Sequence, residues 1–404
     1  MDDLLVIGGG MAGLSAALVA QRAGLQVKLL EQAEAFSEVG AGIQLGPNAV
    51  RVLHDWGLLP ALRELAAFPE RLSVRDARSG AQLGGLTLGA AIEQRYGQPY
   101  ATIHRADLHQ LLLYQLQGSG QVECRLRQRL QGFEQEANSV SLQTEDGSRY
   151  QAGALLGCDG LWSRVRGQLL ADGAPVFSGD LAYRGLVPMA DLPPELRRNQ
   201  VTAWLAPGLH AVHYPVRAGA AMNVIVVVEG PIPPDPESWD HAAQAPQLRR
   251  ALGSVHGDFD RLLQAVPDWR LWPLNARAPM RGPHEHAQGR VALLGDAAHP
   301  TRPYLAQGAA MALEDAWTLG RLLEQPGWRM GAAAAGHGID WPGLLQALAR
   351  RRWRRNAWIQ QRSRRNGQIF HAAGPLRWGR DLGMALLGER LVDLPELYRG
   401  PPAP

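Results

Sequence analysis

The sequence predicts an α/β fold in which separated segments build one parallel sheet and a second, sheet-rich domain is inserted between them. Short apolar runs at Leu4–Ile7, Ala154–Leu156 and Val291–Leu294 each lead into a glycine, a pattern typical of buried parallel strands. A glycine-rich turn and a helical stretch follow the first run. Residues 176–280 differ in character, because prolines cluster there between strand-like runs. Parallel strands on both sides of this region imply one domain made of discontinuous segments.

Length and composition narrow the class of protein. The 404 residues suffice for two or three domains, and 46% hydrophobic with 20% charged residues is ordinary globular composition. A net charge of +3 is too small to indicate a nucleic-acid partner. Cys124 and Cys158 match neither a disulfide framework nor a metal site. No apolar run reaches the roughly 18 residues of a membrane span, and the N-terminus lacks a signal-peptide pattern. We therefore expect a cytoplasmic protein with no membrane span.

Periodicity and turn residues place the other elements. Met11–Ala23 predicts a helix and Val27–Leu30 a strand, so the chain opens with a βαβ unit. Residues 70–100 predict short strands, and residues 120–157 predict a hairpin or a three-stranded meander. Further helices are expected at Asn48–Trp56, Asp107–Leu116 and Gln307–Leu323, and strands of the inserted domain at Leu209–Val216 and Asn223–Val228.

The C-terminal part of the chain is rich in glycine and then in arginine. Residues 325–343 predict a mobile loop, and residues 344–366 predict a strongly basic helix. We expect this helix to pack on the discontinuous domain with its basic face in solvent, and a membrane or nucleic-acid surface is the alternative. The predicted division is 1–70, 100–175 and 281–343 for the discontinuous domain, 71–99 and 176–280 for the inserted domain, and 344–404 for a C-terminal helical segment.

The turn after the first strand, residues 8–13, fits the pattern G-x-G-x-x-G. Gly8 permits a tight turn, Gly10 lets the backbone approach a pyrophosphate, and Gly13 lets helix and strand pack closely. The N-terminus of the following helix offers free N–H groups and a partial positive charge to phosphates. Glu31, at the end of the next strand, can accept hydrogen bonds from ribose hydroxyls. The loop alone does not distinguish FAD from NAD, and an ordinary glycine turn is the alternative.

Two more strands end in a glycine beside an aspartate. Asp159 and Gly160 follow one of them, and Gly295 and Asp296 follow the other. Each aspartate then stands at the carboxyl end of a strand, where open parallel sheets bind ligands. For either aspartate alone, a turn residue or a helix N-cap is the alternative interpretation.

In this order the three motifs resemble those of the single-component FAD-dependent aromatic hydroxylases, also called group A flavoprotein monooxygenases. The resemblance covers nearly the whole chain and implies a glutathione-reductase-like FAD-binding Rossmann domain. It assigns the glycine loop to the ADP half of FAD, Asp159 to contacts with FAD and NAD(P)H, Asp296 to the ribityl chain, and Arg105 to the phosphate and ribose region. The cofactor-binding residues it implies are Gly8, Gly10, Met11, Ala12, Gly13, Glu31, Gln32, Arg105, Asp159, Gly160, Asp296, Pro303 and Gly308.

The chain is more closely similar to the salicylate, 3-hydroxybenzoate and 6-hydroxynicotinate hydroxylases, through residues 40–48, 212–216 and 303–308. In such enzymes NADH or NADPH is a transient co-substrate that reduces FAD. O2 then adds to give a flavin C4a-hydroperoxide, whose outer oxygen attacks an electron-rich ring. A dry pocket and a base that removes a phenol proton favour this reaction. The resemblance implies hydroxylation of a small phenolic, carboxylated aromatic by a homodimer that needs no metal.

His210 and Tyr214 are the candidate catalytic residues. They are four apart in a strand-like run, so they face the same side of a sheet. The resemblance aligns them with a histidine and a tyrosine that contact substrate. We expect His210 to act as the acid/base partner of the substrate hydroxyl and Tyr214 as a donor in the pocket, with a surface histidine and a core tyrosine as the alternative. His213 is expected to face the other side of the sheet.

Further positions complete the expected substrate site. The resemblance places the backbone of Pro303 against the flavin ring. Tyr304 and Gln44 stand where the hydroxynicotinate branch has histidines, which disfavours that substrate. Arg184 and Arg302 are candidates for binding a carboxylate, and ordinary surface or supporting arginines are the alternative. The substrate-binding residues implied are Gln44, His210, Tyr214, Pro303 and Tyr304.

Other readings of the sequence are weaker. His284 and His286 are only two residues apart and no third ligand is evident, so we expect a loop there and no zinc site. An NAD-dependent dehydrogenase would use only the first glycine loop and leave Asp159 and Asp296 unexplained. A non-catalytic flavin-binding or regulatory protein would bind FAD without substrate-stimulated oxidation of NAD(P)H.

Overall fold

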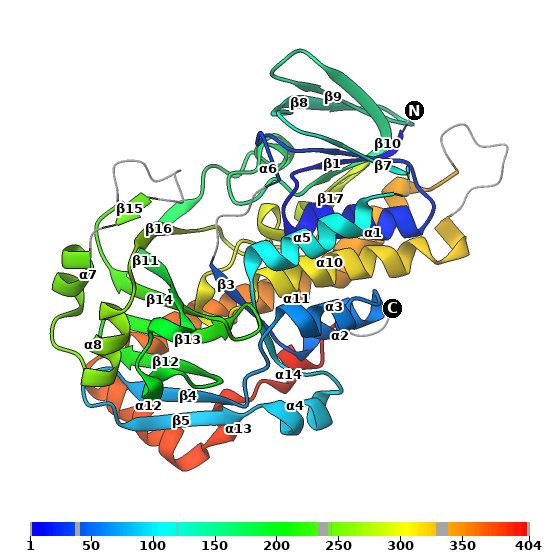
Figure 1. Cartoon of the computed structure of the whole chain (residues 1–404). Helices are drawn as coiled ribbons and strands as arrows, with labels where there is room; N and C mark the ends of the chain where they lie inside the picture. Colours follow the sequence, from blue (N-terminus) through cyan, green and yellow to red (C-terminus); the bar gives the residue numbers. More distant parts are fainter. Residues whose placement is uncertain are drawn as a thin grey trace.

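The strands of the protein fall into two large sheets and one small one. A computed structural model describes residues 2–36, 41–118, 120–232, 241–243, 245–328 and 338–401. Within these residues, two sheets have eight strands each and a third has two. Figure 1 shows the first sheet near the N-terminus, the second sheet to one side of it, and long helices between them.

The first sheet has the order β17-β18-β10-β1-β2-β7, and β9 joins β10 to β8. The pairings from β18 through β10, β1 and β2 to β7 are parallel, whereas β8, β9 and β10 form an antiparallel meander. The strands are β1 (Asp2–Ile7), β2 (Val27–Leu30), β7 (Val122–Arg125), β8 (Leu130–Gln135), β9 (Val140–Thr144), β10 (Arg149–Gly157), β17 (Ala287–Gln288) and β18 (Val291–Leu293).

Three helices cover one face of this sheet: α1 (Met11–Arg22), α5 (Arg105–Leu116) and α10 (Gly308–Leu323). Their apolar side chains pack with those of β1, β2 and β10 into one large core. The meander packs against the opposite face, together with α6 (Arg164–Leu170).

The second sheet has the order β15-β16-β11-β14-β13-β12-β4-β5. Its strands come from two stretches of chain, because β4 pairs with β12 across more than a hundred residues. Helices α7 (Ala245–Leu252) and α8 (Gly257–Gln264) cover one face. The strands are β4 (Arg71–Asp76), β5 (Gln82–Thr87), β11 (Val176–Pro188), β12 (Gln200–Ala206), β13 (Leu209–Val216), β14 (Ala221–Glu229), β15 (His241–Ala243) and β16 (Trp269–Ala276).

Smaller elements connect the two sheets. The two-stranded sheet of β3 (Gly42–Leu45) and β6 (Ala101–His104) lies between them. Before the C-terminal segment, the other helices of the described residues are α2 (Pro47–Asp55), α3 (Leu59–Leu65), α4 (Gly89–Tyr96) and α9 (Pro283–His286). The short 3-10 turns are η1 (Met189–Asp191), η2 (Pro194–Leu196), η3 (Gly295–Ala297), η4 (Pro303–Leu305) and η5 (Pro326–Trp328).

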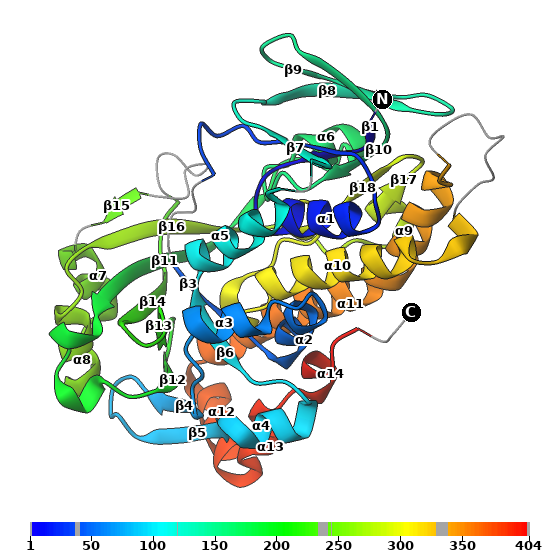
Figure 2. The same ribbon diagram turned by 45° about the vertical axis from the view of Figure 1, so that its right-hand side comes forward.

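The C-terminal segment is helical and reaches both sheets. Helix α11 (Trp341–Phe370) lies alongside α10, and α12 (Gly374–Leu387) and α13 (Glu389–Val392) then pack against β5 (Figure 2). A last short helix, α14 (Pro395–Tyr398), returns to α2. The α/β fold with its helical C-terminal segment is therefore as the sequence predicts.

Most predicted elements are present, and the differences are local. The strand Leu209–Val216 has the predicted bounds, and the meander alternative is the right one for residues 120–157. The prediction of a loop at residues 284–286 is wrong, because these residues belong to helix α9 and β17 follows directly. The expected loop at 325–343 contains η5 and the first turn of α11, while residues 329–337 lie outside the described residues.

The prediction that the basic face of the C-terminal helix lies in solvent is also wrong for two of its arginines. Arg352 is 1% exposed, and it donates to Asp315 at 2.8 Å and to Glu314 at 2.9 Å on α10. Arg355 contacts Glu314 through two nitrogens, at 2.7 and 2.8 Å. Asn48 on α2 donates to Glu314 as well. The acids that balance these arginines come from another helix, so the arginine run alone could not reveal the pairing.

We predict that Arg352→Met lowers the free energy of unfolding by about 3–5 kcal/mol, because it leaves Glu314 and Asp315 with less compensation inside the protein. Urea titration followed by circular dichroism measures the change. Arg351→Met is the matched control, since Arg351 is exposed on the same helix. Equal stability of the two variants would contradict the prediction.

Candidate active site

The carboxyl ends of four adjacent parallel strands meet at one edge of the first sheet. The glycine loop follows β1, and Glu31 follows β2. Asp159 comes just after β10, and Asp296 comes three residues after the end of β18. Because β18, β10, β1 and β2 are neighbours in this order, the three separated motifs converge on a single edge. This is the edge at which open parallel sheets bind ligands.

The glycine loop has the close packing that its spacing predicts. Gly8 has a φ of +102°, and a Cβ there would lie 2.4 Å from the carbonyl oxygen of Cys158. A Cβ on Gly13 would lie 1.8 Å from the carbonyl oxygen of Gly8. Helix α1 begins at Met11, and no side chain caps its first N–H groups at Gly10. The helix N-terminus is thus available for an anionic group.

Glu31 braces the glycine loop. Its carboxylate accepts hydrogen bonds from the backbone N–H of Gly9 at 2.6 Å and of Ala33 at 2.8 Å. Each carboxylate oxygen can accept a further bond, so hydroxyl groups of a ribose can still be accommodated. Gln32 beside it is exposed.

Asp159 holds the start of α6. Its carboxylate accepts from the Ser163 hydroxyl at 2.5 Å and from the backbone N–H groups of Arg164 and Val165 at 2.8 and 3.1 Å. Asp159 thus accepts from the first N–H groups of α6, but the N-cap residue of this helix is Ser163, so the alternative of Asp159 as the N-cap itself is wrong. Gly160, the next residue, lines the cleft at the sheet edge.

Arg166 on α6 connects the second motif to the third. Its guanidinium is 2% exposed and donates to the carbonyl oxygens of Ala297 and Ala298 at 3.1 and 2.8 Å. It also contacts Asp172 at 2.6 and 2.8 Å. The loop after β18 is therefore held by a residue that follows β10.

A cleft opens where these segments meet. Asp296 is exposed to the cleft. Desolvation by the surrounding protein raises the pKa of its carboxyl group, and the positive charge of Arg105 opposes this increase. A helix N-terminus, a cation and a carboxylate are the groups that the pyrophosphate and hydroxyls of FAD require, so these residues fit that cofactor. Of the predicted cofactor residues, the cleft is lined by Gly10, Met11, Ala12, Arg105, Gly160, Asp296, Pro303 and Gly308.

A second cavity of about 1140 Å³ lies between the second sheet and the C-terminal helices. Its walls are mostly apolar side chains of β4, β12, β13, α11 and α12. The lining of the cleft and the lining of this cavity share five residues: Gln44, His210, Val212, Pro303 and Ala306. The two spaces therefore adjoin at these residues, where a cofactor in the cleft would face a molecule in the cavity.

His210 lies at this junction. It is 4% exposed on β13, and its Nδ1 lies 2.9 Å from the Nε2 of His371. The rings of Tyr304 and Phe370 are within 5.0 and 5.5 Å of its ring, measured between centroids. Burial lowers the pKa of His210 well below its usual range, and the neighbouring His371 lowers it further. The imidazole is thus neutral at physiological pH and can accept a proton.

Tyr214 lines the cleft but has its proton committed to the protein. Its hydroxyl donates to the carbonyl oxygen of Gly42 at 2.7 Å, and Asn223 accepts from the N–H of the same glycine at 2.7 Å. These bonds fix β3 to the second sheet. The geometry therefore favours a role for Tyr214 in holding β3 over that of a donor to substrate.

His213 faces the other side of β13, as predicted. Its ring is stacked near that of Trp204, with centroids 6.4 Å apart, under α7 and α8. Burial lowers its pKa to about 4.

Several polar residues in the walls of the cavity and the cleft contact other side chains. Gln44 accepts from the Tyr100 hydroxyl at 2.7 Å. Tyr304 donates to Asp180 at 2.7 Å, and Arg302 lies 3.6 Å from the same carboxylate. Arg184, also on the cleft wall, is 4% exposed, and its guanidinium lies 4.3 Å from the centre of the Trp272 ring.

Sequence reasoning missed His371, Asp180 and Asn223. His371 stands next to the end of α11, and Asp180 and Asn223 stand within β11 and β14. None belongs to a local motif. A signal was available for Asn223. It is a polar residue in the otherwise apolar strand β14, so the alternation argument that singled out His210 and Tyr214 on β13 could have been applied to it as well.

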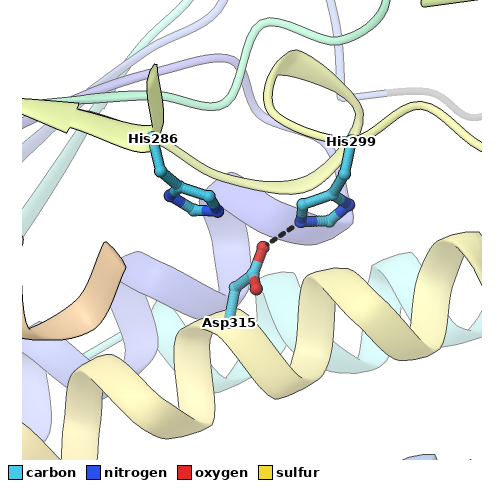
Figure 3. Close-up of side chains that lie close together, drawn as sticks. All are labelled: His286, His299 and Asp315. Carbon is cyan, nitrogen blue, oxygen red and sulfur yellow. Dashed lines mark hydrogen bonds and ion pairs between the residues drawn. The ribbon is translucent and has the colours of Figure 1, made fainter. Parts of the chain in front are cut away.

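Near the cleft, His286, His299 and Asp315 each direct one ligand-type atom to a common point, with these atoms within 4.8 Å of one another (Figure 3). The expectation that His286 has no further ligands near it is therefore wrong. Yet Asp315 already accepts from His299 at 2.5 Å, from Gly295 N–H at 3.1 Å and from Arg352 at 2.8 Å. His299 and Arg352 hold the pKa of Asp315 well below its usual range in spite of burial. With its oxygens occupied and a cation beside it, we interpret the cluster as a hydrogen-bonded support for the Gly295 turn.

Comparison with known proteins identifies the family. Residues 2–332 match the family model described as FAD binding domain. The chain is 37% identical over 399 residues to a 3-hydroxybenzoate 6-hydroxylase of Polaromonas naphthalenivorans, covering 98% of this chain and 95% of the relative. This chain belongs to the FAD-dependent aromatic monooxygenases. The predicted FAD cofactor is confirmed, and the interpretation as an NAD-dependent dehydrogenase is set aside.

Other members of the family extend the likeness over the whole chain. A 3-amino-4-hydroxybenzoate 2-monooxygenase, PtnB3 of Streptomyces platensis, is 38% identical over 402 residues and covers 99% of this chain and 96% of its own length. A salicylate hydroxylase in complex with substrate has a TM-score of 0.80 at 26% identity, covering 98% of this chain and 95% of that structure. None of the helices in the described ranges has both the length and the apolar composition to cross a membrane.

We predict that Asp296→Ala weakens FAD binding roughly tenfold to a hundredfold, because it removes a charged hydrogen-bond acceptor from the cleft. Quenching of flavin fluorescence on titration of the apoprotein measures the affinity. Asp191→Ala, in the turn η1 outside the cleft, is the control. Unchanged affinity in Asp296→Ala would exclude the expected contact.

Proposed function

We propose that this monooxygenase hydroxylates a small phenol that carries a carboxylate, such as 3-hydroxybenzoate or salicylate. The observation that carries the proposal is the position of His210, a buried imidazole at the point where the cofactor cleft adjoins the apolar cavity. The relatives named as hydroxylases of 3-hydroxybenzoate and of aminohydroxybenzoate support this class of substrate.

The cofactor site is proposed from the residues that surround the cleft. The N-terminus of α1 would hold the pyrophosphate, Glu31 and Arg105 the ribose and phosphate region, and Asp296 the ribityl hydroxyls. When bound, FAD supplies the electron transfer from NADH or NADPH and the activation of O2. Pro303 and Gly308 line the cleft beside the cavity, so we place the reactive ring there.

His210 would act on the substrate hydroxyl. Its Nδ1 faces His371, which leaves Nε2 for the cavity, and no described residue hydrogen-bonds to that atom. A phenol whose O–H points at Nε2 can give up its proton to this nitrogen. The resulting phenolate has a more electron-rich ring, which is the property that an electrophilic oxygen donor requires.

The walls of the two spaces supply the remaining requirements. Arg184 and Arg302 place positive charge on the cleft side, where a substrate carboxylate can form paired hydrogen bonds. Apolar side chains such as Leu72 and Leu305 line the cavity side and disfavour water there. Exclusion of water protects a reactive oxygen donor from unproductive decay.

Location and assembly are also part of the proposal. Cys124 and Cys158 are both unpaired, which suits the reducing cytoplasm where NAD(P)H is present. The family resemblance implies a homodimer, and size-exclusion chromatography with light scattering measures it.

We expect the purified protein to be yellow and to oxidise NADH or NADPH faster when 3-hydroxybenzoate or salicylate is added. The product should be heavier than the substrate by one oxygen atom, measured by mass spectrometry. A panel that includes benzoate and 6-hydroxynicotinate tests the need for the phenol and the choice of ring. Binding of FAD without any stimulation across the panel would favour a non-catalytic flavin-binding protein.

We predict that His210→Ala lowers the rate of hydroxylation by about 10²–10⁴-fold, the usual contribution of a general base. Flavin reduction by NAD(P)H should persist, so oxygen consumption shifts from product to hydrogen peroxide. Stopped-flow absorbance and product analysis measure the two steps. His54→Ala, at an exposed site on α2, is the control, and normal coupling in His210→Ala would refute the assignment.

A further inference from the structure

The C-terminal segment contributes a histidine to the candidate catalytic base. His371 follows directly after α11, and its Nε2 lies 2.9 Å from Nδ1 of His210. The backbone holds it in this place, because the carbonyl oxygen of His371 accepts from the N–H of Gly208, in the turn before β13. Arg380 on α12 also binds the carbonyl oxygen of Phe370, one residue earlier, at 3.0 Å.

Two carboxylates stand on the other side of His371. Its Nδ1 lies 3.9 Å from Asp180 and 3.8 Å from Glu229, which are opposite one another on β11 and β14. Asp180 is buried, whereas the side chain of Glu229 is 68% exposed. His371 therefore stands between His210, to which it is hydrogen-bonded, and the exposed carboxylate of Glu229, 3.8 Å from its other nitrogen.

We propose that His371 is the relay through which the proton taken up by His210 leaves the cavity. This inference rests on the proposed function, in which a phenol loses its proton to His210. The O–H bond of the phenol breaks and the proton joins Nε2 of His210. The proton on Nδ1 of His210 passes to Nε2 of His371, and the proton on Nδ1 of His371 passes to solvent water beside the exposed carboxylate of Glu229. No electron is transferred, and both imidazoles end neutral.

The placement of charge explains why a second histidine is needed. A proton that stayed on His210 would create a cation in an apolar, buried site, which is unfavourable. His371 is better suited to carry the charge, because Asp180 and Glu229 favour its charged form, although burial lowers its pKa overall. The groups that face His371 are His210 from β13, Asp180 from β11, Glu229 from β14, and Arg302 and Tyr304 from the segment before α10. The positive charge of Arg302 disfavours the protonated form of His371. Arg302 also lies 3.6 Å from Asp180 and so shares that carboxylate with His371.

The test separates a relay from a merely structural residue by comparing two substitutions. His371→Gln keeps one acceptor and one donor at the position but cannot pass a proton. His371→Ala removes the side chain and leaves space that exogenous imidazole can enter. His284→Gln, at an exposed site on α9, is the matched control.

The measurement uses the FAD-loaded enzyme mixed with 3-hydroxybenzoate in the absence of NAD(P)H, so that binding and deprotonation are observed without turnover. Stopped-flow ultraviolet absorbance follows formation of the bound phenolate, and an indicator dye in weak buffer follows proton release. We expect His371→Gln to slow both signals together by roughly tenfold or more while the affinity changes less than about threefold. Imidazole should restore the rate in His371→Ala and not in His371→Gln.

Two kinetic results would overturn the relay. One is a wild-type rate of phenolate formation in His371→Gln. The other is an equal loss of binding in both variants with no rescue by imidazole, which indicates a structural role. If wild-type enzyme forms no phenolate with any phenol of the panel, the proposed function fails first. Histidine ¹⁵N NMR of the substrate-free enzyme then decides: the relay requires a proton on Nδ1 of His210 in the wild type, and the Nε2–H tautomer contradicts it.

Discussion

The structure depends on the carboxylate of Asp315, which joins three parts of the chain that are distant in sequence. One oxygen accepts from Arg352 on α11 and the other from His299 and from the backbone of Gly295. The C-terminal helix is thereby attached to the turn that carries Asp296 into the cleft. A buried ion pair gives little net stability, but it penalises any arrangement in which one partner is missing. It therefore specifies the position of α11 more than it strengthens the fold.

From this attachment, α11 extends to the other sheet and delivers His371 beside His210. The substrate side is fixed by a different clamp, in which Tyr214 and Asn223 of the second sheet hold Gly42 of β3. The boundary between the cleft and the cavity is thus held by two independent contacts, one between His371 and His210 and the other between the second sheet and Gly42. The candidate base belongs to one sheet, the cofactor residues to the other, and the group behind the base to the C-terminal segment.

Local chemistry explains which features could be predicted from the sequence. The glycine loop, Glu31 and the two aspartates act within a few residues of a strand end, so their spacing carries the information. Strand alternation was enough to place His210 and His213 on opposite sides of β13. The bonds of Asp159 to the start of α6 could not be distinguished from ligand binding, because an aspartate that supports a helix start and one that binds a ligand stand at the same kind of turn. Arg352 and His371 could not be placed, since their partners lie 37 and 161 residues away.

The length of α11 between its two contacts has a consequence for how this chain can change. Arg352 lies within α11 and His371 directly after its end, 19 positions further along the chain, and each residue of the helix advances it by about 100° and about 1.5 Å. Insertion or deletion of a single residue between them would rotate one contact away while the other stayed in place. Substitutions along the exposed side of the helix leave the rotation between the two contacts unchanged. The spacing is thus a fixed quantity, which constrains the number of residues in this segment more strictly than their identity.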